Sequence, residues 1–515
     1  MRLRARPLSL EAGGKPFVIL NKQDAEALSI HALDRVELRN RGRSLSAIAD
    51  ITARFAEPGE LVTGDAVTRF FGLRPGDPVA VEHGERPESV AYIREKVTGN
   101  RLDGGKMGTI VRDALDRRLS DPELTAFVVA LELHGVSLEE AEALSRAMLE
   151  TGRTLRVPAR NVVDKHSVGG IPGDKTSLLV VPLVAAAGLT IPKTSSRAIT
   201  SPAGTADRFE VLAPVALEAE EILRVVKRTH GCIAWGGALN LAPADDLFIQ
   251  VEYPLSIDPL LMPSILSKKK AVGARFVVLD IPTGRGAKVK TVGEAHALAR
   301  DFIALGGRLG MKVACAVTLG EQPVGRAIGP ALEAREALEA LRGRGPADLA
   351  EKATRLAGLL FETVKGRNSG TEHARRLLRS GKAEAKMRQI IAEQGGDPEV
   401  RPSDIPIGRR ANIRAAKEGR VLWVKNAEIA AVAREAGAPR DPGAGVLLHV
   451  KTGSRVKRGG LLFSIFSSNG SRIEHALRMA SESEPVVVAR GLEQKMLLDK
   501  IPARVPHPRP FILER

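Results

Sequence analysis

Cysteine and aromatic residues are scarce in this chain. Among its 515 residues there are two cysteines, Cys232 and Cys315, and aromatic side chains make up 3%. Two distant cysteines exclude a disulfide framework and a CxxC metal site, and they are typical of a reducing compartment, so we expect a cytoplasmic protein. The low aromatic content, beside abundant alanine, leucine, valine and glycine, favours alanine-packed helices and parallel-sheet units over an aromatic-rich β-sandwich.

Long hydrophobic runs are also missing. The longest apolar segment, LLVVPLVAAAGLTI, is short for a membrane span and is interrupted by Pro182 and Gly188. The stretch MRLRARPLSLEAGGK at the start is basic but contains no apolar core of a secretory signal. The sequence therefore predicts neither a membrane partner nor a secretory route.

Positive charge is the strongest compositional feature. The formal net charge is +16 and the pI is about 10.0. Lysine and arginine are spread along the chain without the interleaved aromatic residues that stack on nucleic-acid bases, and the clearest run is Lys268-Lys269-Lys270. We interpret the charge as a field that attracts anionic substrates and expect no nucleic-acid partner. A basic nucleic-acid-binding protein stays open as an alternative.

The first part of the chain predicts two different domains. A weak internal repeat, SIHALDRVEL and GLRPGDPVAV, predicts a small β-rich domain with pseudo-twofold symmetry over residues 1–86. Capping-box spacings that begin at Ser120 and Ser137 predict helices, and hence a helical domain over residues 87–160 that further helices from later in the chain complete.

The rest of the chain has an α/β pattern. The β-branched runs RFVVLDI and MKVACAVTL alternate with helical stretches and predict a mainly parallel α/β domain over residues 161–411. Alternating valine and leucine with glycine turns predict a C-terminal α+β domain over residues 412–515. The fold class that we expect is multi-domain α/β, with the helical and α/β domains facing each other across a cleft.

The segment DKHSVGGIPGDKTS, residues 164–177, combines glycines, hydroxyls and cations just before an apolar run. A glycine-rich turn that leads into a helix can hold phosphate through backbone N–H groups and the helix dipole. Lys165 would add a point charge, and Ser167 and Ser177 would donate hydroxyl hydrogen bonds. A plain glycine turn with a capping serine is the alternative interpretation.

This segment differs from the phosphate-binding loop of nucleoside triphosphatases. That loop requires an adjacent Gly-Lys pair, whereas Asp174 separates Gly173 from Lys175 here. We therefore do not expect a nucleoside triphosphatase.

Two further stretches suggest a site that offers several hydrogen bonds to a ligand. KTSSRAITSPAGTAD, residues 193–207, places hydroxyls around Arg197, and its small residues allow close approach of backbone to a ligand. A third stretch, which ends in SILSKKK, contains Asp258, Ser264 and Lys268. Asp258 precedes a proline, which favours an extended turn where its carboxyl group can face a cleft, although a helix N-cap is the simpler interpretation.

Together the three stretches resemble the thymidine/pyrimidine-nucleoside phosphorylase family. DKHSVGG resembles the family's DKHS-x-GG signature, SSRAITSPAGTAD resembles its second phosphate and sugar loop, and LAPAD and SILSKK recur in the same order. The resemblance runs from about Tyr92 to the C-terminus. It is greatest to the long branch, which includes AMP phosphorylases and bacterial proteins assigned to thymidine phosphorolysis.

The resemblance implies phosphorolysis, in which inorganic phosphate is the co-substrate and neither a metal nor another cofactor is needed. Phosphate attacks C1′ while the leaving base is protonated. Asp258 matches the proton donor of the nucleotide-using branch, and His166 and Lys268 match positions near base and sugar. The implied phosphate ligands are Lys165, Ser167, Ser177, Ser195 and Thr205. The implied substrate-binding residues are Gly170, Ser196, Arg197, Ala198, Ile199, Thr200, Ser201, Ser264 and Lys288.

One departure from the family bears on the substrate. The nucleoside branch places an arginine on the pyrimidine within a segment resembling YALRDVT, whereas FIQVEYPLS here has no arginine. This difference favours a nucleoside 5′-monophosphate (AMP, CMP or UMP), with Arg197 and Lys288 on its 5′-phosphate, and ribose 1,5-bisphosphate as product. Thymidine, which would give deoxyribose 1-phosphate, stays open.

Two more expectations complete the interpretation. A transferase similar to anthranilate phosphoribosyltransferase would share the helical-plus-α/β architecture and stays an alternative. Such an enzyme needs a metal–diphosphate loop, and this sequence offers no convincing acidic pair for Mg²⁺ beyond Asp245-Asp246. The resemblance also implies a homodimer or larger homo-oligomer, with the terminal domains serving assembly.

Overall fold

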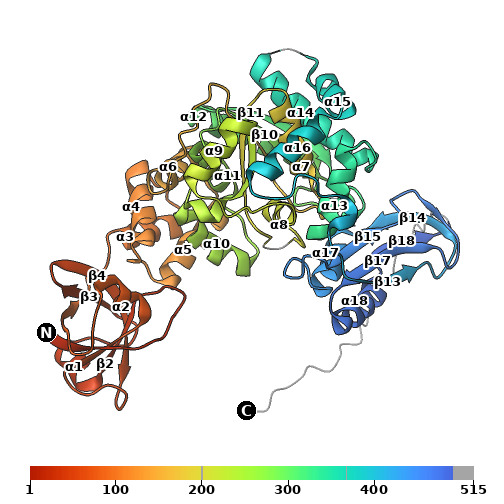
Figure 1. Cartoon of the computed structure of the whole chain (residues 1–515). Coiled ribbons are helices and arrows are strands. Elements are labelled where there is room, and N and C mark those ends of the chain that lie inside the picture. Colours follow the sequence, from red (N-terminus) through yellow and green to blue (C-terminus); the bar gives the residue numbers. More distant parts are fainter. Residues whose placement is uncertain (199–200, 367, 491–515) are drawn as a thin grey trace, which may run out of the picture.

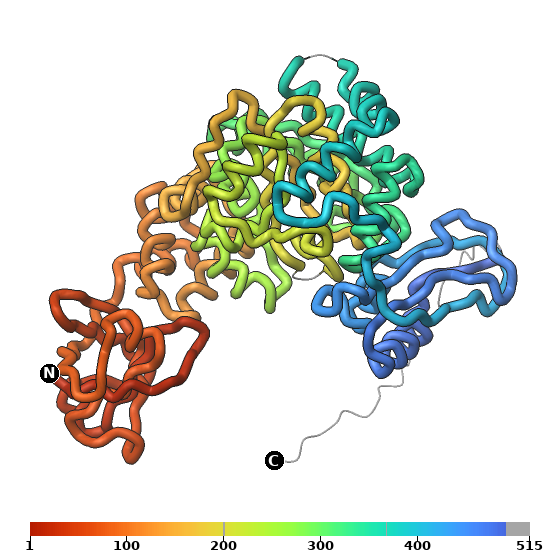
Figure 2. Tube along the Cα trace, viewed as in Figure 1, coloured from red at the N-terminus to blue at the C-terminus, as the bar shows by residue number. Residues whose placement is uncertain are grey.

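The computed structural model describes residues 1–198, 201–366 and 368–490. The fold contains four units: a small barrel, a helical bundle, a central α/β domain and a C-terminal α+β domain (Figure 1). The trace in Figure 2 shows the barrel and the C-terminal domain as lobes on either side of the central body. The predicted fold class is confirmed.

The N-terminal unit is a closed six-stranded barrel in the order β1-β5-β2-β4-β3-β6. β1 pairs in parallel with β5 and antiparallel with β6, and β4 pairs with β2 and β3 in the same two ways, so a pseudo-twofold axis relates the halves. Closure removes the free sheet edges, and the barrel's own apolar side chains fill its interior. Its elements are β1 (Arg2–Pro7), β2 (Phe17–Asn21), α1 (Lys22–Ala27), β3 (Arg35–Asn40), β4 (Arg43–Thr52), β5 (Glu60–Thr63), α2 (Asp65–Phe71) and β6 (Pro78–His83).

The helical bundle begins with helices whose caps were expected from the sequence. At Ser137 the capping box is complete: the Glu140 N–H donates to the serine hydroxyl at 3.2 Å, and the Ser137 N–H donates to the Glu140 carboxylate at 2.9 Å. At Ser120 the Glu123 carboxylate accepts both the backbone N–H and the hydroxyl at 2.8 Å. These bonds satisfy groups that a helix start leaves unpaired. The bundle contains α3 (Ser89–Val97), α4 (Gly104–Leu115), α5 (Asp121–His134), α6 (Leu138–Glu150), α10 (Pro243–Leu255) and α11 (Leu261–Ala271).

The α/β domain is built on parallel strands. β11, β10 and β7 form one sheet, and a bridge between Val162 and Thr190 connects it to the parallel pair β8 and β9. Alternate residues of β10 enter opposite cores, Val277 and Leu279 on one face and Val278 on the other, so helices cover both faces. The strands are β7 (Val163–Ser167), β8 (Ile191–Ser195), β9 (Gly231–Trp235), β10 (Phe276–Thr283) and β11 (Lys312–Leu319). The helices are α7 (Thr176–Ala186), α8 (Thr205–Glu210), α9 (Ala219–Thr229), α12 (Val292–Arg308), α13 (Pro330–Leu341), α14 (Ala347–Lys365), α15 (Gly370–Arg379) and α16 (Lys382–Glu393).

The C-terminal domain contains two antiparallel sheets, β12-β15-β17-β13 and β16-β14-β18. β12 lies between β11 and α13 in the sequence, so the α/β segment supplies an edge strand to this domain. β13 starts at Arg409, slightly before the boundary expected at residue 412. The elements are β12 (Ala327–Ile328), β13 (Arg409–Arg414), β14 (Gly419–Val424), α17 (Asn426–Glu435), β15 (Gly445–Leu448), β16 (Arg455–Val456), β17 (Leu461–Ser467), α18 (Gly470–Ser483) and β18 (Val486–Ala489).

Membrane-spanning helices are absent from the three described ranges, since none of their helices combines the length and apolarity that a bilayer requires.

Candidate active site

The glycine-rich segment connects β7 to α7 at the carboxyl edge of the parallel sheet. Lys165, His166 and Ser167 end β7, and Ser177 lies buried in the first turn of α7. At Gly173, where φ is +72°, a Cβ atom would lie 2.8 Å from two carbonyl oxygens of residues 324 and 327. Glycine is therefore required at this turn. The carboxyl edge of an open α/β sheet is where ligands bind in such folds.

Lys165 has a buried ammonium group with few protein partners. The residue is 3% exposed, and the nearest carboxylate oxygen, Oδ2 of Asp280, lies 4.0 Å from its Nζ. Within the described residues Nζ makes no hydrogen bond. The Ser167 hydroxyl is close by and donates to the same carboxylate at 2.9 Å. A buried cation with unused donors favours an anionic ligand, because leaving such donors unpaired is costly.

Asp280 lies at the centre of a buried ion network beneath this loop. It is fully buried on β10, accepts the Thr318 hydroxyl at 2.6 Å and pairs with the Lys352 Nζ at 2.8 Å. The same ammonium lies 3.2 Å from Asp174 of the glycine-rich loop. Burial lowers the pKa of Lys352, but Asp174 and Asp280 outweigh it and raise that pKa above its usual value. Lys352 on α14 therefore holds the loop to the sheet as a cation.

A second network surrounds Asp164, the residue before Lys165. Asp164 is fully buried, and its carboxylate lies 2.7 Å from the Lys269 Nζ and 3.8 Å from the Lys193 Nζ. The Lys193 Nζ also donates to the Thr194 carbonyl at 2.8 Å. Burial lowers the pKa of Lys193 well below its usual range, although Asp164 opposes the shift. β7, β8 and α11 thus meet at one carboxylate.

Sequence reasoning missed both networks. Asp164 and Asp280 lie in the segments DKHSVGGIPGDKTS and RFVVLDI, where neither was assigned a role. A lone carboxylate within an apolar strand is nevertheless a signal that could have singled them out. Lys193 and Lys269 stood in quoted motifs without a role, and Lys352, on a distant amphipathic helix, carries no such signal.

His166 is half-buried among these cations. Burial, followed by the charges of Lys269, Lys193, Lys165 and Lys268, lowers its pKa well below the ordinary value. The imidazole is therefore neutral at pH 7 and can both donate and accept a hydrogen bond.

Lys268 and Ser264 lie one turn apart on α11, where the Lys268 Nζ is 3.5 Å from the serine hydroxyl. The same ammonium pairs with the buried carboxylate of Asp245 on α10. The two predicted residues are thus held together on the side of the helical bundle that contacts the sheet.

Three predicted residues from separate loops also meet. Asp258 lies in the loop between α10 and α11, and its Oδ2 is 2.9 Å from the Nζ of Lys288, which follows β10. A Cβ atom on Gly170 would be 3.1 Å from the Lys288 Cγ. The loop is supported by Glu252, a 6% exposed carboxylate that accepts the Leu260 N–H at 3.2 Å. Burial, and then the charge of Asp258, raises the pKa of Glu252 to about 7.

The second glycine- and serine-rich loop, after β8, is organised by carboxylates of α8. Asp207 accepts the Ala198 N–H at 2.7 Å and the Gly204 N–H at 2.8 Å, which ties the two ends of the loop together. The Arg197 guanidinium pairs with Glu210 at 2.6 Å and lies 5.0 Å from the centre of the Trp235 ring. Arg197 therefore faces Glu210, whereas Lys288 faces Asp258.

The hydroxyls of this second loop make local bonds. The Ser195 hydroxyl, at the end of β8, donates to the Ser196 carbonyl at 3.1 Å, and the Ser201 hydroxyl donates to the Ala203 carbonyl at 3.0 Å. Thr205 is the first residue of α8. The predicted residues Ile199 and Thr200 lie outside the described residues.

Comparison with known proteins identifies the domains that carry these loops. Residues 159–384 match the family described as glycosyl transferase family, a/b domain, and residues 90–152 match its helical bundle domain. Residues 421–486 match the pyrimidine nucleoside phosphorylase C-terminal domain. The AMP phosphorylase of Thermofilum pendens is 47% identical over 516 residues, which is 100% of both chains. The AMP phosphorylase of Pyrococcus furiosus is 49% identical over 95% of this chain and 98% of its own length.

The chain belongs to the thymidine/pyrimidine-nucleoside phosphorylase family. The full-length similarity to AMP phosphorylases places it in the long branch, and it is an enzyme of the pentosyltransferase class. Among solved structures, the anthranilate phosphoribosyltransferase of Thermus thermophilus aligns with a TM-score of 0.50 at 22% identity, covering 59% of this chain and 98% of that one. This last likeness concerns the shared fold alone.

Proposed function

We propose that this phosphorylase cleaves the N-glycosidic bond of a nucleoside 5′-monophosphate (AMP, CMP or UMP) with inorganic phosphate. The products are the free base and ribose 1,5-bisphosphate. The full-length similarity to AMP phosphorylases supports the reaction. The observation that carries the proposal concerns Lys165, whose buried side chain makes no hydrogen bond through its ammonium within the described residues. It lies beside a hydroxyl and a glycine turn at the carboxyl edge of the sheet.

Lys165 and Ser167 would hold the attacking phosphate in this reaction. The ammonium supplies positive charge, and the hydroxyl can turn from Asp280 to a phosphate oxygen. Ser177, Ser195 and Thr205 are proposed as further phosphate ligands. An anion fixed beneath C1′ also stabilises the positive charge that develops there as the bond to the base breaks.

Asp258 would act on the opposite side of the sugar as the proton donor. One phosphate oxygen forms the bond to C1′, the electron pair of the C1′–N bond passes to the base, and the proton of Asp258 goes to a base nitrogen. The neutral His166 ring can hydrogen-bond the base or sugar without adding charge. Ser264 and Lys268 are proposed to contact the sugar from α11.

The 5′-phosphate is assigned to Lys288 and Arg197. Both cations are partly exposed and are now paired with carboxylates, Asp258 and Glu210. A phosphate dianion can replace a carboxylate on either cation, and release of Lys288 leaves Asp258 free to take up the proton that it donates. We assign Gly170, Ser196, Ala198 and Ser201, together with Ile199 and Thr200 outside the described residues, to the ribose and phosphate.

The proposal is tested by base release from AMP, CMP, UMP, thymidine and uridine, with and without phosphate. We expect phosphate-dependent release from the monophosphates, and a loss of about 100-fold or more in kcat/KM when Lys165→Ala and Ser167→Ala are combined. Lys288→Ala should raise the KM for AMP about 10-fold, whereas Lys312→Ala, an exposed lysine on β11, should not. Unchanged turnover in the double variant would refute the phosphate assignment. Release from thymidine alone would assign the enzyme to the nucleoside branch.

We further propose that the enzyme needs no metal or cofactor, works in the cytoplasm and forms a homodimer or larger homo-oligomer. The two cysteines are free thiols, and Cys232 is buried, which suits a reducing compartment. Activity after treatment with EDTA and the mass from analytical ultracentrifugation test these points.

A further inference from the structure

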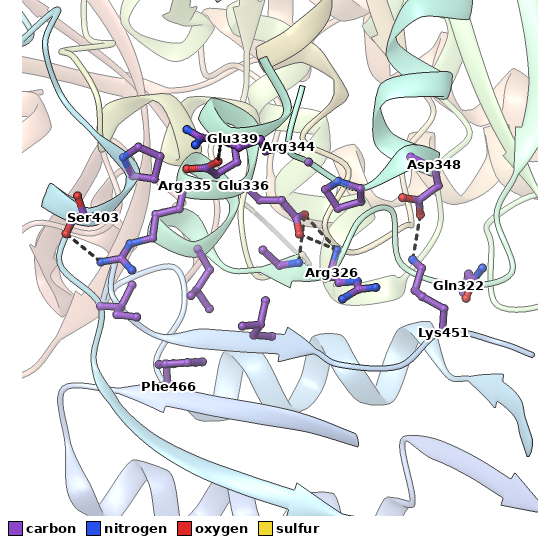
Figure 3. A pocket seen from close by; sticks show the side chains of 18 residues that line it. Gln322, Arg326, Arg335, Glu336, Glu339, Arg344, Asp348, Ser403, Lys451 and Phe466 are labelled. Atoms are coloured by element: carbon purple, nitrogen blue, oxygen red, sulfur yellow. Dashed lines mark hydrogen bonds and ion pairs between the residues drawn. The ribbon is translucent and has the colours of Figure 1, made fainter. Parts of the chain in front are cut away.

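A large cavity lies between the α/β domain and the C-terminal sheet, on the far side of the glycine-rich segment 164–177, which we call the phosphate loop. Its volume is about 870 Å³, which is within the range of nucleotide-sized ligand sites. Arg326 and Arg335 line it from the α/β domain, and Leu447, Lys451 and Phe466 line it from the C-terminal domain (Figure 3). None of the residues assigned above to phosphate, base or sugar lines this cavity.

The carboxylates of the cavity wall already have partners. Glu336 accepts the Lys175 ammonium at 2.5 Å and the Arg326 backbone N–H at 3.0 Å. Asp348 lies 3.0 Å from the Lys451 Nζ and accepts the Gly325 N–H at 3.1 Å. Glu339 pairs with Arg344 at 3.0 Å. The protein's own cations and backbone N–H groups thus neutralise the negative charge of the wall.

Two guanidinium groups of the wall have no such compensation. The Arg326 side chain is exposed and makes no hydrogen bond or ion pair within the residues that the structure describes. Among the described residues, the Arg335 side chain donates only to the backbone carbonyls of Ile405, at 2.9 Å, and Ser403, at 3.5 Å. Burial lowers the pKa of Arg335, the direction expected of a partly buried cation without a carboxylate.

Further positive charge lies next to the cavity lining on the C-terminal sheet, where Arg410 of β13 is paired across from Phe466 of β17. Arg410 donates to the neutral partners Asn412, at 2.8 Å, and Ser464, at 2.9 Å. Burial, followed by the charges of Arg410 and Arg326, lowers the pKa of His449 on the same sheet. This part of the sheet thus carries a positive charge whose side-chain partners are neutral.

The remaining wall is apolar. Leu332, Leu447 and Phe466 pack together with Ile407 at the base of the cavity. A ligand with one anionic end and one apolar ring matches this arrangement. We propose that this cavity is a second binding site, for a nucleoside phosphate whose phosphate groups lie on Arg326 and Arg335 and whose base lies against Leu332, Leu447 and Phe466.

One segment of the cavity wall also contacts the phosphate loop. The buried Lys175 Nζ donates to the carbonyls of Val324, at 3.0 Å, and Ala327, at 3.2 Å, and Gly173 turns against the same two carbonyls. A nucleotide in the cavity would therefore contact a segment, residues 322–327, that supports the loop from behind.

Calorimetric titration with ATP tests the site without any turnover, so its outcome is independent of the proposed reaction. The protein is the full chain carrying Lys288→Ala, which weakens nucleotide binding at the candidate active site. We expect one ATP per chain, with adenosine at least about 10-fold weaker because it lacks the anionic end.

Arg326→Glu in the same background should weaken ATP at least about 10-fold, because the substitution reverses a charge at the phosphate position. The matched control is Arg300→Glu on α12, an exposed arginine on the far side of the α/β domain (Figure 1), which changes net charge equally. No ATP binding, or equal affinity in the Arg326 and Arg300 variants, would overturn the proposal. Circular dichroism spectra confirm that both variants are folded.

Discussion

Replacing Asp164 by asparagine should destabilise the α/β domain strongly. Its carboxylate is fully buried, 2.7 Å from the Lys269 ammonium and 3.8 Å from that of Lys193. The substitution keeps the side chain's shape but leaves two buried cations without their anion. Breaking a buried ion pair from one side costs about 3–5 kcal/mol. Since 1 kcal/mol shifts Tm by about 2–4 °C in a domain of this size, we expect a decrease of roughly 6–20 °C.

Differential scanning calorimetry at several pH values measures this effect. Burial already lowers the pKa of Lys193, and loss of Asp164 lowers it further, so the folded variant releases the Lys193 proton at a lower pH than the wild type does. Folded protein that binds fewer protons than the unfolded chain gains stability as pH rises. The deficit of the variant should therefore shrink as pH rises from neutral through the lowered pKa of Lys193.

The matched control is Asp116→Asn, because Asp116 is an exposed aspartate at the end of α4. Surface substitutions of this kind change stability by less than about 0.5 kcal/mol. A Tm decrease no larger than that of the control, or a deficit that grows with pH, would refute the reasoning about Asp164.

Three further predictions concern the loops around Lys288. Glu252→Gln should leave Tm unchanged near pH 4.5 and raise it by several degrees above pH 7. The raised pKa of Glu252, about 7, means that ionisation of the carboxylate destabilises the folded wild type between pH 4.5 and 7, whereas glutamine stays neutral. A Tm difference between variant and wild type that does not change with pH would contradict this. Gly170→Ala should lower kcat/KM for AMP at least about 10-fold, because φ is +88° and the added methyl group would contact Lys288. Gly169→Ala is the control for backbone strain, since φ there is +91° but the space around the added methyl group is open. Equal losses in the two variants would exclude the contact with Lys288 as the cause. Arg285→Ala should raise the KM for AMP roughly 3- to 10-fold at unchanged Tm. Arg285 stacks 3.5 Å from the centre of the Trp423 ring and so fixes the loop after β10 that contains Lys288, the Lys288 loop. An unchanged KM would show that the stacking does not position Lys288.

Much of the architecture follows from local patterns. The run RFVVLDI forms β10 because β-branched residues suit a strand that is buried on both faces. The adjacent residues Val277 and Val278 show this, since they enter opposite cores. The box at Ser137 starts α6 because serine and glutamate satisfy the first N–H groups. Such interactions lie within a few residues of each other, so a single sequence reveals them.

The partners of the charged residues could not be predicted in the same way. Lys268 and Lys269 are adjacent in the sequence, yet one pairs with Asp245 in the helical bundle and the other with Asp164 beneath the sheet. The difference depends on how α11 is rotated between two domains, which is a property of tertiary packing. Lys352 reaches Asp280 from a helix far along the chain, and no spacing rule connects them.

The site assignments stay predictions, but the structure shows which of them are neighbours. Asp258, Lys288 and Gly170 are brought together, as are Ser264 and Lys268. Arg197 and Lys288, both expected on one phosphate, are each paired with a carboxylate, Glu210 and Asp258 respectively. A motif gives residue types but not the salt-bridge partners that compete for them.

The contacts between the C-terminal domain and the Lys288 loop have a consequence for folding during synthesis. Arg285 stacks on Trp423, and the Asn426 side chain donates to the Gly320 carbonyl at 2.8 Å, so both contacts reach back to segments that leave the ribosome much earlier. Because domains fold in order of synthesis, the phosphate loop and its buried ions can form while the Lys288 loop is still unclamped. A chain that stops before residue 423 would thus retain a place for phosphate but not a fixed Lys288, and full competence would arrive only when translation is nearly finished.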